Sequence, residues 1–220
     1  GGSGGGGGGS GAAAGASSSG MGGGDSAAAG SGGTAEGGTT AEPSSGGEGG
    51  SPLVEPSNLV LLYADHSPEG DDPKKSNSVR LVLVLENQGD DSVPLSELSI
   101  RYFYTLEAPS TQTFLCDYVH PAAVVNDCKA VRGSFGTLPA TAAKNYVEVT
   151  FDPPNGAAWS LTPRGGQSGV LQLRFYNGSF AAQDQTNDYS FDPTKVDSPV
   201  PWDHVALYRS GKLVFGVEPE

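Results

Sequence analysis

The stretch LSIRYFYTL at residues 98–106 decides the fold class, because large apolar side chains recur at every second position. Successive side chains of a β-strand point to opposite faces, so Ile100, Tyr102 and Tyr104 share one predicted face. A strand with three large apolar side chains on one face needs a second layer to cover them. The stretch therefore predicts a strand at the core of a layered β structure.

Eight further stretches carry strand patterns, and no stretch has a convincing helical period. Gly and Pro are frequent in the connections, and Ser210-Gly211 predicts a tight hairpin between the last two strands. Repeated short strands predict an all-β fold of two packed sheets, a sandwich or jelly roll, with a flat or grooved ligand surface. The eight stretches are 58–63, 80–86, 111–119, 131–135, 146–151, 169–175, 204–208 and 212–215.

The N-terminal part of the chain differs from the rest in composition. Residues 1–50 are almost wholly Gly, Ser, Ala and Thr, with Met21 as the one sizeable apolar side chain. Such a segment cannot bury enough surface to offset the entropy of ordering its backbone. We therefore expect a disordered tether over residues 1–52, with a reach on the order of 40 Å. Every Trp, Tyr, Phe, Ile and Cys lies after it, and we expect one domain over residues 57–219.

The charge of the chain excludes one class of partner. The formal net charge is −13, and the tether contributes four acidic residues and no basic one, which leaves −9 on the domain. Nucleic acid is bound by clustered Lys and Arg, which the sequence lacks. No apolar run approaches the roughly 18 residues of a membrane span. The sequence thus predicts that the domain binds neither nucleic acid nor the membrane interior. We also expect the domain to be a monomer.

The start of the chain bears on its location. The opening GGSGGGGGGS looks trimmed, and similar tethers follow the lipidated cysteine of many bacterial surface lipoproteins. By this analogy we expect an extracellular or cell-surface location, with lipid anchoring through a removed N-terminal part as one route.

Cys116 and Cys128 are too few for a zinc site and too widely spaced for a CxxC motif. A disulfide and a pair of free, buried thiols remain open alternatives.

Catalytic signatures are absent from the sequence. His66, His120 and His204 lie in unrelated local contexts without a second metal ligand at the usual spacing, and there is no GxSxG motif. We therefore expect a domain that is not an enzyme. The densest polar cluster, residues 184–189, has oxygen ligands suited to calcium, although an Asx-type turn explains the same composition.

Several stretches together resemble the family 3 carbohydrate-binding modules, the cellulose-binding type found on cellulases and cellulosomal scaffolds. They occur in family order and cover nearly all of residues 57–219. They are LSELSIRYFYTLE at 95–107, QTFLCDY at 112–118, QLRFYNGSF at 172–180, QTNDYSF at 185–191, WDHV at 202–205 and VFGVEP at 214–219.

The resemblance implies a nine-stranded jelly roll of two antiparallel sheets with one structural calcium ion. The calcium would join two loops and have only a remote connection with ligand binding. Glu107 stands where the family more often has Asp, and both side chains offer a hard cation carboxylate oxygens. The implied ligands are Thr105, Glu107, Asp184, Asn187 and Asp188.

The resemblance also implies a flat face that lies along cellulose chains. Asp117 and Arg174 match the polar positions of that face, Tyr118 takes the place of its first ring, and Phe180 falls where the strongest binders carry Trp. The loop at 119–129 is shorter than usual and lacks the Tyr that normally projects from it. The apolar face of a sugar ring stacks on such aromatic rings. A second set that matches groove or anchoring positions consists of Asn77, Gln172 and Tyr189.

These features predict a non-catalytic module that anchors its carrier to cellulose or a related β-glucan through a flat surface strip. One alternative is an accessory module that feeds single glucan chains to a catalytic partner. Another is a cell-surface module that binds a non-cellulosic glycan or a protein. Retention on insoluble cellulose discriminates the first hypothesis from the last.

Overall fold

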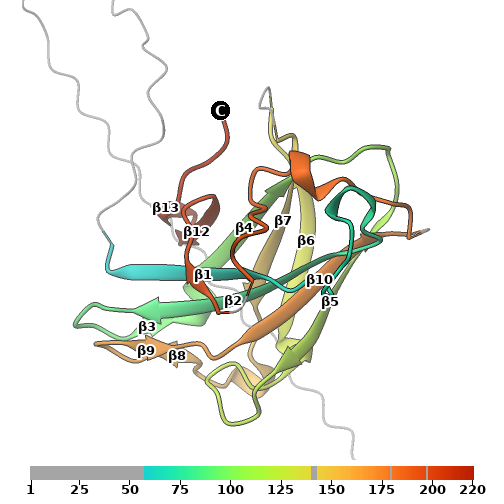
Figure 1. Ribbon diagram of the computed structural model, residues 1–220. Helices are drawn as coiled ribbons and strands as arrows, with labels where there is room; N and C mark the ends of the chain where they lie inside the picture. Colours follow the sequence, from blue (N-terminus) through green and yellow to red (C-terminus); the bar gives the residue numbers. More distant parts are fainter. Residues whose placement is uncertain (1–56, 140–142, 179, 197) are drawn as a thin grey trace, which may run out of the picture. The chain divides into compact units, whose positions relative to one another are not determined.

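The structure is a computed structural model that describes residues 57–139, 143–178, 180–196 and 198–220. The predicted tether at residues 1–52 lies outside these described residues. In the described part, all secondary structure consists of β-strands and short 3-10 helices (Figure 1). The expected all-β fold is confirmed.

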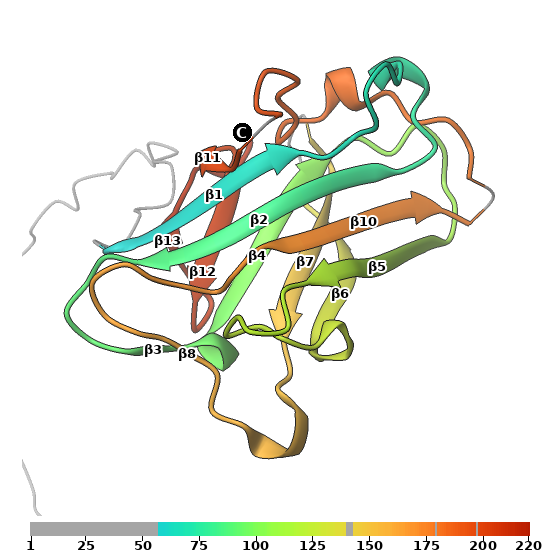
Figure 2. The ribbon, with the colours of Figure 1, turned by 60° about the horizontal axis from the view of Figure 1, so that its bottom comes forward.

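Two antiparallel sheets form the sandwich. Figure 2 shows β1, β2, β10 and β5 side by side in the first sheet, with the strands of the second sheet behind them. The first sheet has the order β11 (Val200–Pro201), β1 (Leu59–Asp65), β2 (Val79–Asn87), β10 (Leu171–Asn177) and β5 (Gln112–Val119), with β9 (Gly166–Gln167) paired to β2. The second has the order β13 (Lys212–Phe215), β12 (Val205–Arg209), β4 (Leu98–Tyr104), β7 (Asn145–Phe151) and β6 (Val131–Thr137).

The remaining elements are short. The two-residue strands β3 (Val93–Pro94) and β8 (Ser160–Leu161) pair with each other apart from the two sheets. In the described residues, nine strands have four residues or more, and each overlaps one of the nine stretches that the sequence pattern predicts. The 3-10 helices are η1 (Pro73–Lys75), η2 (Leu95–Glu97), η3 (Cys128–Ala130), η4 (Pro154–Gly156) and η5 (Gln185–Asn187). None of the helices in this part of the chain has the length or apolar character needed to cross a membrane.

The alternation along β4 builds the core between the sheets. Ile100, Tyr102 and Tyr104 are each at most 1% exposed and belong to the main apolar cluster. The Tyr102 ring packs on Phe175 of β10 at 5.9 Å between centroids and on Tyr63 of β1 at 6.2 Å. Each fully buried large apolar side chain stabilises the fold by roughly 1.5–3 kcal/mol. The core therefore supports the inner face of the first sheet.

Two local features complete the scaffold. Ser210 and Gly211 have positive φ angles of 49° and 79°, which suit the two-residue turn between β12 and β13. Cys116 of β5 and Cys128 of η3 form a disulfide with their Cα atoms 5.3 Å apart. Of the two alternatives that the sequence left open, the structure therefore shows the disulfide and not the free thiols. The bond ties the loop after β5 to that strand.

Candidate carbohydrate-binding face

A β-bulge shapes the outer face of the first sheet where β10 pairs with β5. Leu173 pairs with Cys116, whereas the preceding Gln172 pairs with Tyr118, so that Asp117 is one extra residue on β5. In a regular strand, Asp117 and Tyr118 would point to opposite faces. The bulge breaks this alternation and re-aims one side chain. Consequently the side chain of Asp117 reaches Arg174 while Tyr118 stands opposite Gln172 on the same sheet.

A charged pair on this face joins β10 to the edge strand β5. Asp117 Oδ1 is 3.0 Å from Arg174 Nε, and the two side chains are 37% and 32% exposed. That Nε atom makes no hydrogen bond within the described residues, so the contact is electrostatic. A guanidinium has five N–H donors, more than one carboxylate can accept. Arg174 is therefore held in place by Asp117 and still offers donors to a ligand on the solvent side.

Two exposed aromatic rings flank the charged pair. Among the described residues, Tyr118 and Phe180 are the only aromatic side chains with a large exposed surface, at 43% and 53%. Tyr118 is on β5, and Phe180 follows β10, the strand that carries Arg174. Burying such a large aromatic ring against a ligand is favourable. Exposed rings close together on one face therefore indicate an interaction surface.

Tyr176 also belongs to this face, and the sequence interpretation did not include it. Its ring stacks on Phe180 at 4.2 Å between centroids and 9° between planes. The backbone of Phe180 has a φ of 52°, a left-handed conformation that a bulky residue rarely adopts. The stack therefore holds Phe180 in a defined place after a turn. The period-two alternation that puts Arg174 on the outer face also puts Tyr176 there, so the signal was present in the sequence.

These residues lie along β10 and the neighbouring strand β5, and we call them the strip. Along β10, the outward residues Gln172, Arg174 and Tyr176 are two positions apart, or about 6.6 Å from one to the next. Tyr118 lies beside Gln172, and Asp117 lies beside Arg174. The strip consists of Tyr118, Gln172, Asp117, Arg174, Tyr176 and Phe180.

The two other predicted ligand residues lie in different places. Asn77 is exposed just before β2, and its Oδ1 accepts a hydrogen bond from Ser78 Oγ at 3.4 Å. Tyr189 packs at 6.0 Å from Phe103, which points away from the main core on the second sheet, and it stacks on His204 at 4.3 Å. Since Phe103 and Tyr189 belong to the smaller cluster of the second sheet, Tyr189 is not part of the strip.

The five predicted calcium ligands come together from two loops. The backbone N–H of Thr105 donates to Asp188 Oδ1 at 2.8 Å, and Thr105 Oγ1 donates to the carbonyl of Asn187 at 3.1 Å. The N–H of Asp184 donates to Glu107 Oε1 at 3.0 Å. The loop after β4 and the segment around η5 are therefore joined by direct hydrogen bonds between the predicted ligands.

The donor chemistry of these loops fits a hard cation. Asp188 is 8% exposed, and its burial, together with the charges of Glu107 and Asp184, raises the pKa of its carboxyl to about 8. Both side-chain amide atoms of Gln185 are buried without a hydrogen-bond partner in the described residues. No three His, Cys, Asp or Glu side chains in the described part of the chain cluster closely enough to hold a metal by themselves. A calcium ion there would also need the hydroxyl and carbonyl oxygens of Thr105 and Asn187, ligands that calcium commonly takes.

Comparison with known proteins agrees with this architecture. The family described as Cellulose binding domain matches residues 68–216. The chain is 37% identical over 146 residues to exoglucanase-2 of Thermoclostridium stercorarium, covering 66% of this chain and 15% of that enzyme. It is 31% identical over 171 residues to cellulosomal-scaffolding protein A of Acetivibrio thermocellus, covering 74% of this chain and 8% of the scaffold. The chain thus corresponds to a small part of each of these relatives.

A solved structure shows the same fold. A biomass-sensing module of an RsgI-like protein of Clostridium thermocellum superposes with a TM-score of 0.63 at 28% identity, covering 74% of this chain and 99% of that one. Its description likens it to the family 3 carbohydrate-binding module of the cellulosome. With the family match over residues 68–216 and the two-sheet architecture, the chain belongs to the cellulose-binding family 3 carbohydrate-binding modules, which are non-catalytic.

Proposed function

We propose that this module attaches its carrier to cellulose through the strip on its first sheet. The observation that carries the proposal is that both exposed aromatic rings of the described residues lie on one sheet face, with the Asp117–Arg174 pair between them. A glucan chain has apolar ring faces and hydroxyl groups at the ring edges. Tyr118 and Phe180 would stack on the ring faces while Arg174, Asp117 and Gln172 bond the hydroxyls.

Alanine substitutions of the two rings test this proposal. We expect Tyr118→Ala and Phe180→Ala each to weaken binding to microcrystalline cellulose several-fold, because each removes a stacking surface. The melting temperature should change by only a few degrees, since both side chains are largely in solvent. The measurement is a binding isotherm on insoluble cellulose, with Val217→Ala, another exposed apolar residue, as the control. Unchanged binding by both ring variants would remove the strip from the proposal.

A second candidate function is supported by the composition of the strip. Phe180 has one ring face covered by Tyr176, and the strip holds no third exposed ring in the described residues. Fewer free ring faces suit a single glucan chain better than the surface of a crystal. Under this candidate, the module presents single chains to a catalytic partner. Retention on amorphous cellulose without retention on microcrystalline cellulose would favour it over anchoring.

We also propose that a calcium ion occupies the two loops that carry Thr105, Glu107, Asp184, Asn187 and Asp188. The buried Asp188 carboxyl with its raised pKa and the unpartnered Gln185 amide support this proposal. A bound cation would favour the ionised form of Asp188 and hold the loop after β4 against η5. Its role would be structural, because these loops contribute no residue to the strip.

An extracellular or cell-surface location follows from the proposed ligand, since cellulose is an external polymer. The likeness to a cellulosomal scaffold protein supports it. The Gly-rich composition of residues 1–50, similar to the tethers of bacterial surface lipoproteins, supports lipid anchoring as one route to that location. We propose a monomer, as a single module presents the whole strip. The alternative of a surface module for a non-cellulosic glycan or a protein would be favoured if soluble xyloglucan or a partner protein bound and cellulose did not.

A further inference from the structure

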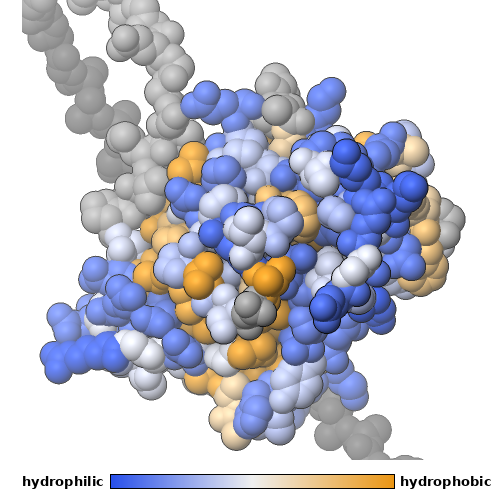
Figure 3. Space-filling view, viewed as in Figure 1, coloured by the Kyte–Doolittle hydropathy of each residue, from blue (hydrophilic) through white to orange (hydrophobic). Residues whose placement is uncertain are grey.

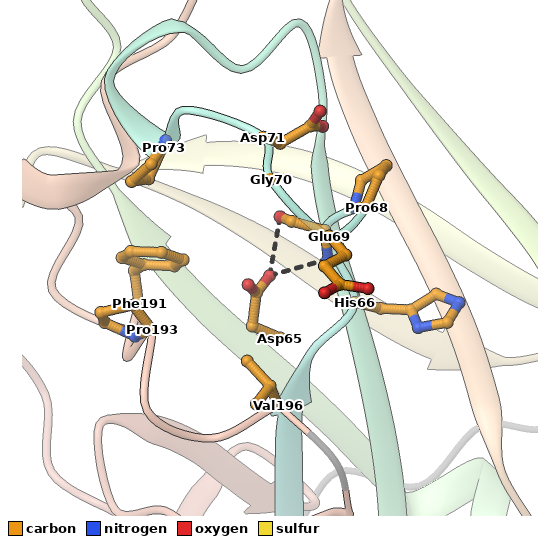
Figure 4. A pocket seen from close by; sticks show the side chains of 11 residues that line it. Asp65, His66, Pro68, Glu69, Gly70, Asp71, Pro73, Phe191, Pro193 and Val196 are labelled. Carbon is orange, nitrogen blue, oxygen red and sulfur yellow. Dashed lines mark hydrogen bonds between the residues drawn. The ribbon is translucent and has the colours of Figure 1, made fainter.

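A pocket opens between the loop after β1 and the segment that follows η5, apart from the strip. Its volume is 530 Å³, within the range of about 300–1,000 Å³ that is typical of ligand pockets. Figure 4 shows side chains from both segments facing this space. The lining residues are Asp65, His66, Ser67, Pro68, Glu69, Gly70, Asp71, Pro73, Phe191, Pro193 and Val196.

A buried carboxylate forms the base of the pocket. Asp65, the last residue of β1, is 8% exposed. Its Oδ1 accepts hydrogen bonds from the N–H and the hydroxyl of Ser67 at 3.1 and 2.9 Å. Its other oxygen turns to the side of Phe191 (Figure 4). Burial raises the pKa of this carboxyl, and an added positive charge beside it would favour its ionised form.

The rest of the lining is apolar in its walls and acidic at its rim. Rings of proline and phenylalanine form the walls, and the exposed Glu69 and Asp71 stand at the opening. Among the described residues that line the pocket there is no Lys or Arg. The nearby Lys195 is occupied elsewhere, because its ammonium lies 3.4 Å from Asp192 Oδ2 and 4.5 Å from the centroid of the Trp202 ring. The wall residues are Pro68, Pro73, Phe191, Pro193 and Val196.

The surface around the pocket is hydrophilic, and the domain that carries it is acidic. Figure 3 shows hydrophilic residues gathered on the side of the molecule where Figure 1 places the loop after β1 and η5. The domain as a whole is acidic, and three carboxylates line this one pocket. An incoming positive charge would therefore be attracted over a distance of about one Debye length, roughly 8–10 Å at physiological salt.

We propose that this pocket binds the lysine or arginine side chain of a protein partner. The aliphatic stem of such a side chain would pack along the proline and phenylalanine walls. Its positive group would pass the carboxylate of Glu69 and reach the Asp65 carboxylate. There it would lie near the face of the Phe191 ring, where cations are attracted. The pocket shares no residue with the strip, so a partner can bind while the strip holds cellulose.

An amino sugar is a poorer match for the same carboxylates. It carries hydroxyl groups around its ring, and these would face proline and phenylalanine side chains that cannot bond them. In the described lining, Ser67 and His66 are the only side chains outside the carboxylates that offer hydrogen-bonding atoms. Polar groups buried without partners cost free energy, so the pocket favours a cation on an apolar stem.

The first test uses short capped peptides with the full chain. An acetylated and amidated Gly-Lys-Gly peptide, and its Arg counterpart, should give saturable NMR chemical-shift changes at Asp65, Glu69 and Phe191. The same peptide with an N-ε-acetylated lysine should not, because acetylation removes the charge. Glucosamine is the comparison ligand. Equal shifts with the acetylated peptide, or saturation by glucosamine alone, would overturn the proposal.

Substitutions locate the site and separate it from the strip. Asp65→Asn keeps the acceptor for Ser67 and should weaken peptide binding about tenfold or more, since it removes one charge of a desolvated pair. Asp90→Asn, an exposed carboxylate that pairs with Arg164 elsewhere, is the matched control and should leave peptide binding unchanged. Binding to cellulose should be unchanged in both variants, so the outcome is independent of the proposed cellulose function.

A second pair of variants covers the case in which Asp65→Asn folds poorly. Glu69→Gln changes an exposed side chain and should weaken binding of the lysine peptide several-fold. Phe191→Leu keeps an apolar wall and removes the ring face, and it should weaken binding by a smaller factor. Full peptide affinity in folded Asp65→Asn, or in both Glu69→Gln and Phe191→Leu, would contradict the assignment of the pocket.

Discussion

At the scale of single residues, the strip depends on how its rings are supported. Phe180 adopts a left-handed backbone conformation, and such a conformation costs of order 1–3 kcal/mol in a non-glycine residue. Its parallel stack on Tyr176 offsets part of that cost, since aromatic pairs are worth about 0.5–1.5 kcal/mol beyond the area they bury. Tyr176 is thus a positioning residue for Phe180.

Removing the supporting ring should affect binding more than stability. We expect Tyr176→Ala to weaken cellulose binding several-fold, because Phe180 loses the surface that orients it, and to lower the free energy of unfolding by about 1 kcal/mol. The measurements are a cellulose isotherm and urea unfolding. Thr113→Ala, which changes the residue opposite Tyr176 on β5, serves as the control. Wild-type affinity in Tyr176→Ala would show that Phe180 holds its place without the stack.

At the scale of elements, β5 brings three different interactions together in three successive residues. Cys116 forms the disulfide to η3, Asp117 holds Arg174, and Tyr118 exposes its ring. The bulge opposite Leu173 makes this possible, because it lets Asp117 and Tyr118 both serve the outer face. The disulfide therefore anchors the end of the strand that carries two of the six residues of the strip.

The disulfide should contribute measurably to stability. The bond closes a loop with a sequence separation of 12, for which the loss of unfolded-chain entropy predicts about 3 kcal/mol. We expect a variant with Cys116→Ser and Cys128→Ser to lose about that much free energy of unfolding in urea and to bind cellulose more weakly.

Reduction of the wild-type protein provides the control, because it opens the same bond without changing the sequence. It should lower stability to a similar extent. A double variant as stable as the wild type would show that η3 is held by its other contacts alone.

At the scale of the whole molecule, the loop after β4 and η5 join parts of the chain that are about eighty residues apart. The hydrogen bonds from Thr105 to Asp188 and Asn187 make this connection. Ser190 adds to it, since its hydroxyl accepts from the N–H of Phe103 at 2.8 Å. A cation bound between these loops would stabilise the folded state as a whole, because only the folded chain assembles its ligands.

Chelation should reveal the proposed calcium ion. At a calcium concentration 100 times the dissociation constant, binding stabilises the fold by about 2.7 kcal/mol. We therefore expect EGTA to lower the melting temperature by roughly 5–10 °C, at about 2–4 °C per kcal/mol for a domain of this size. Excess calcium should restore the melting temperature.

Asp188→Asn should abolish this calcium dependence, because the substitution removes the buried carboxylate. Asp127→Asn changes a carboxylate on a different loop and should retain the dependence. An EGTA-insensitive melting temperature in the wild type would exclude a structural calcium ion at these loops.

The strands themselves were predictable because alternation is a local property. The pattern of Ile100, Tyr102 and Tyr104 needs only the geometry of one strand to place these side chains on the core face. The same alternation places Tyr176 on the outer face with Arg174, so its position was equally local information. The disulfide was different, because two cysteines in a sequence do not reveal whether their backbones approach closely enough.

The sequence by itself determined the all-β class, the nine longer strands, the hairpin at Ser210-Gly211 and, through its motifs, the family. These features follow from side-chain periodicity, turn chemistry and residue order, which are local properties of the sequence. Only the tertiary structure decided that Asp117 lies beside Arg174, that Tyr176 supports Phe180 and that Tyr189 packs against the second sheet. It alone formed the pocket at Asp65, because a cavity arises where segments more than a hundred residues apart in sequence fold against each other.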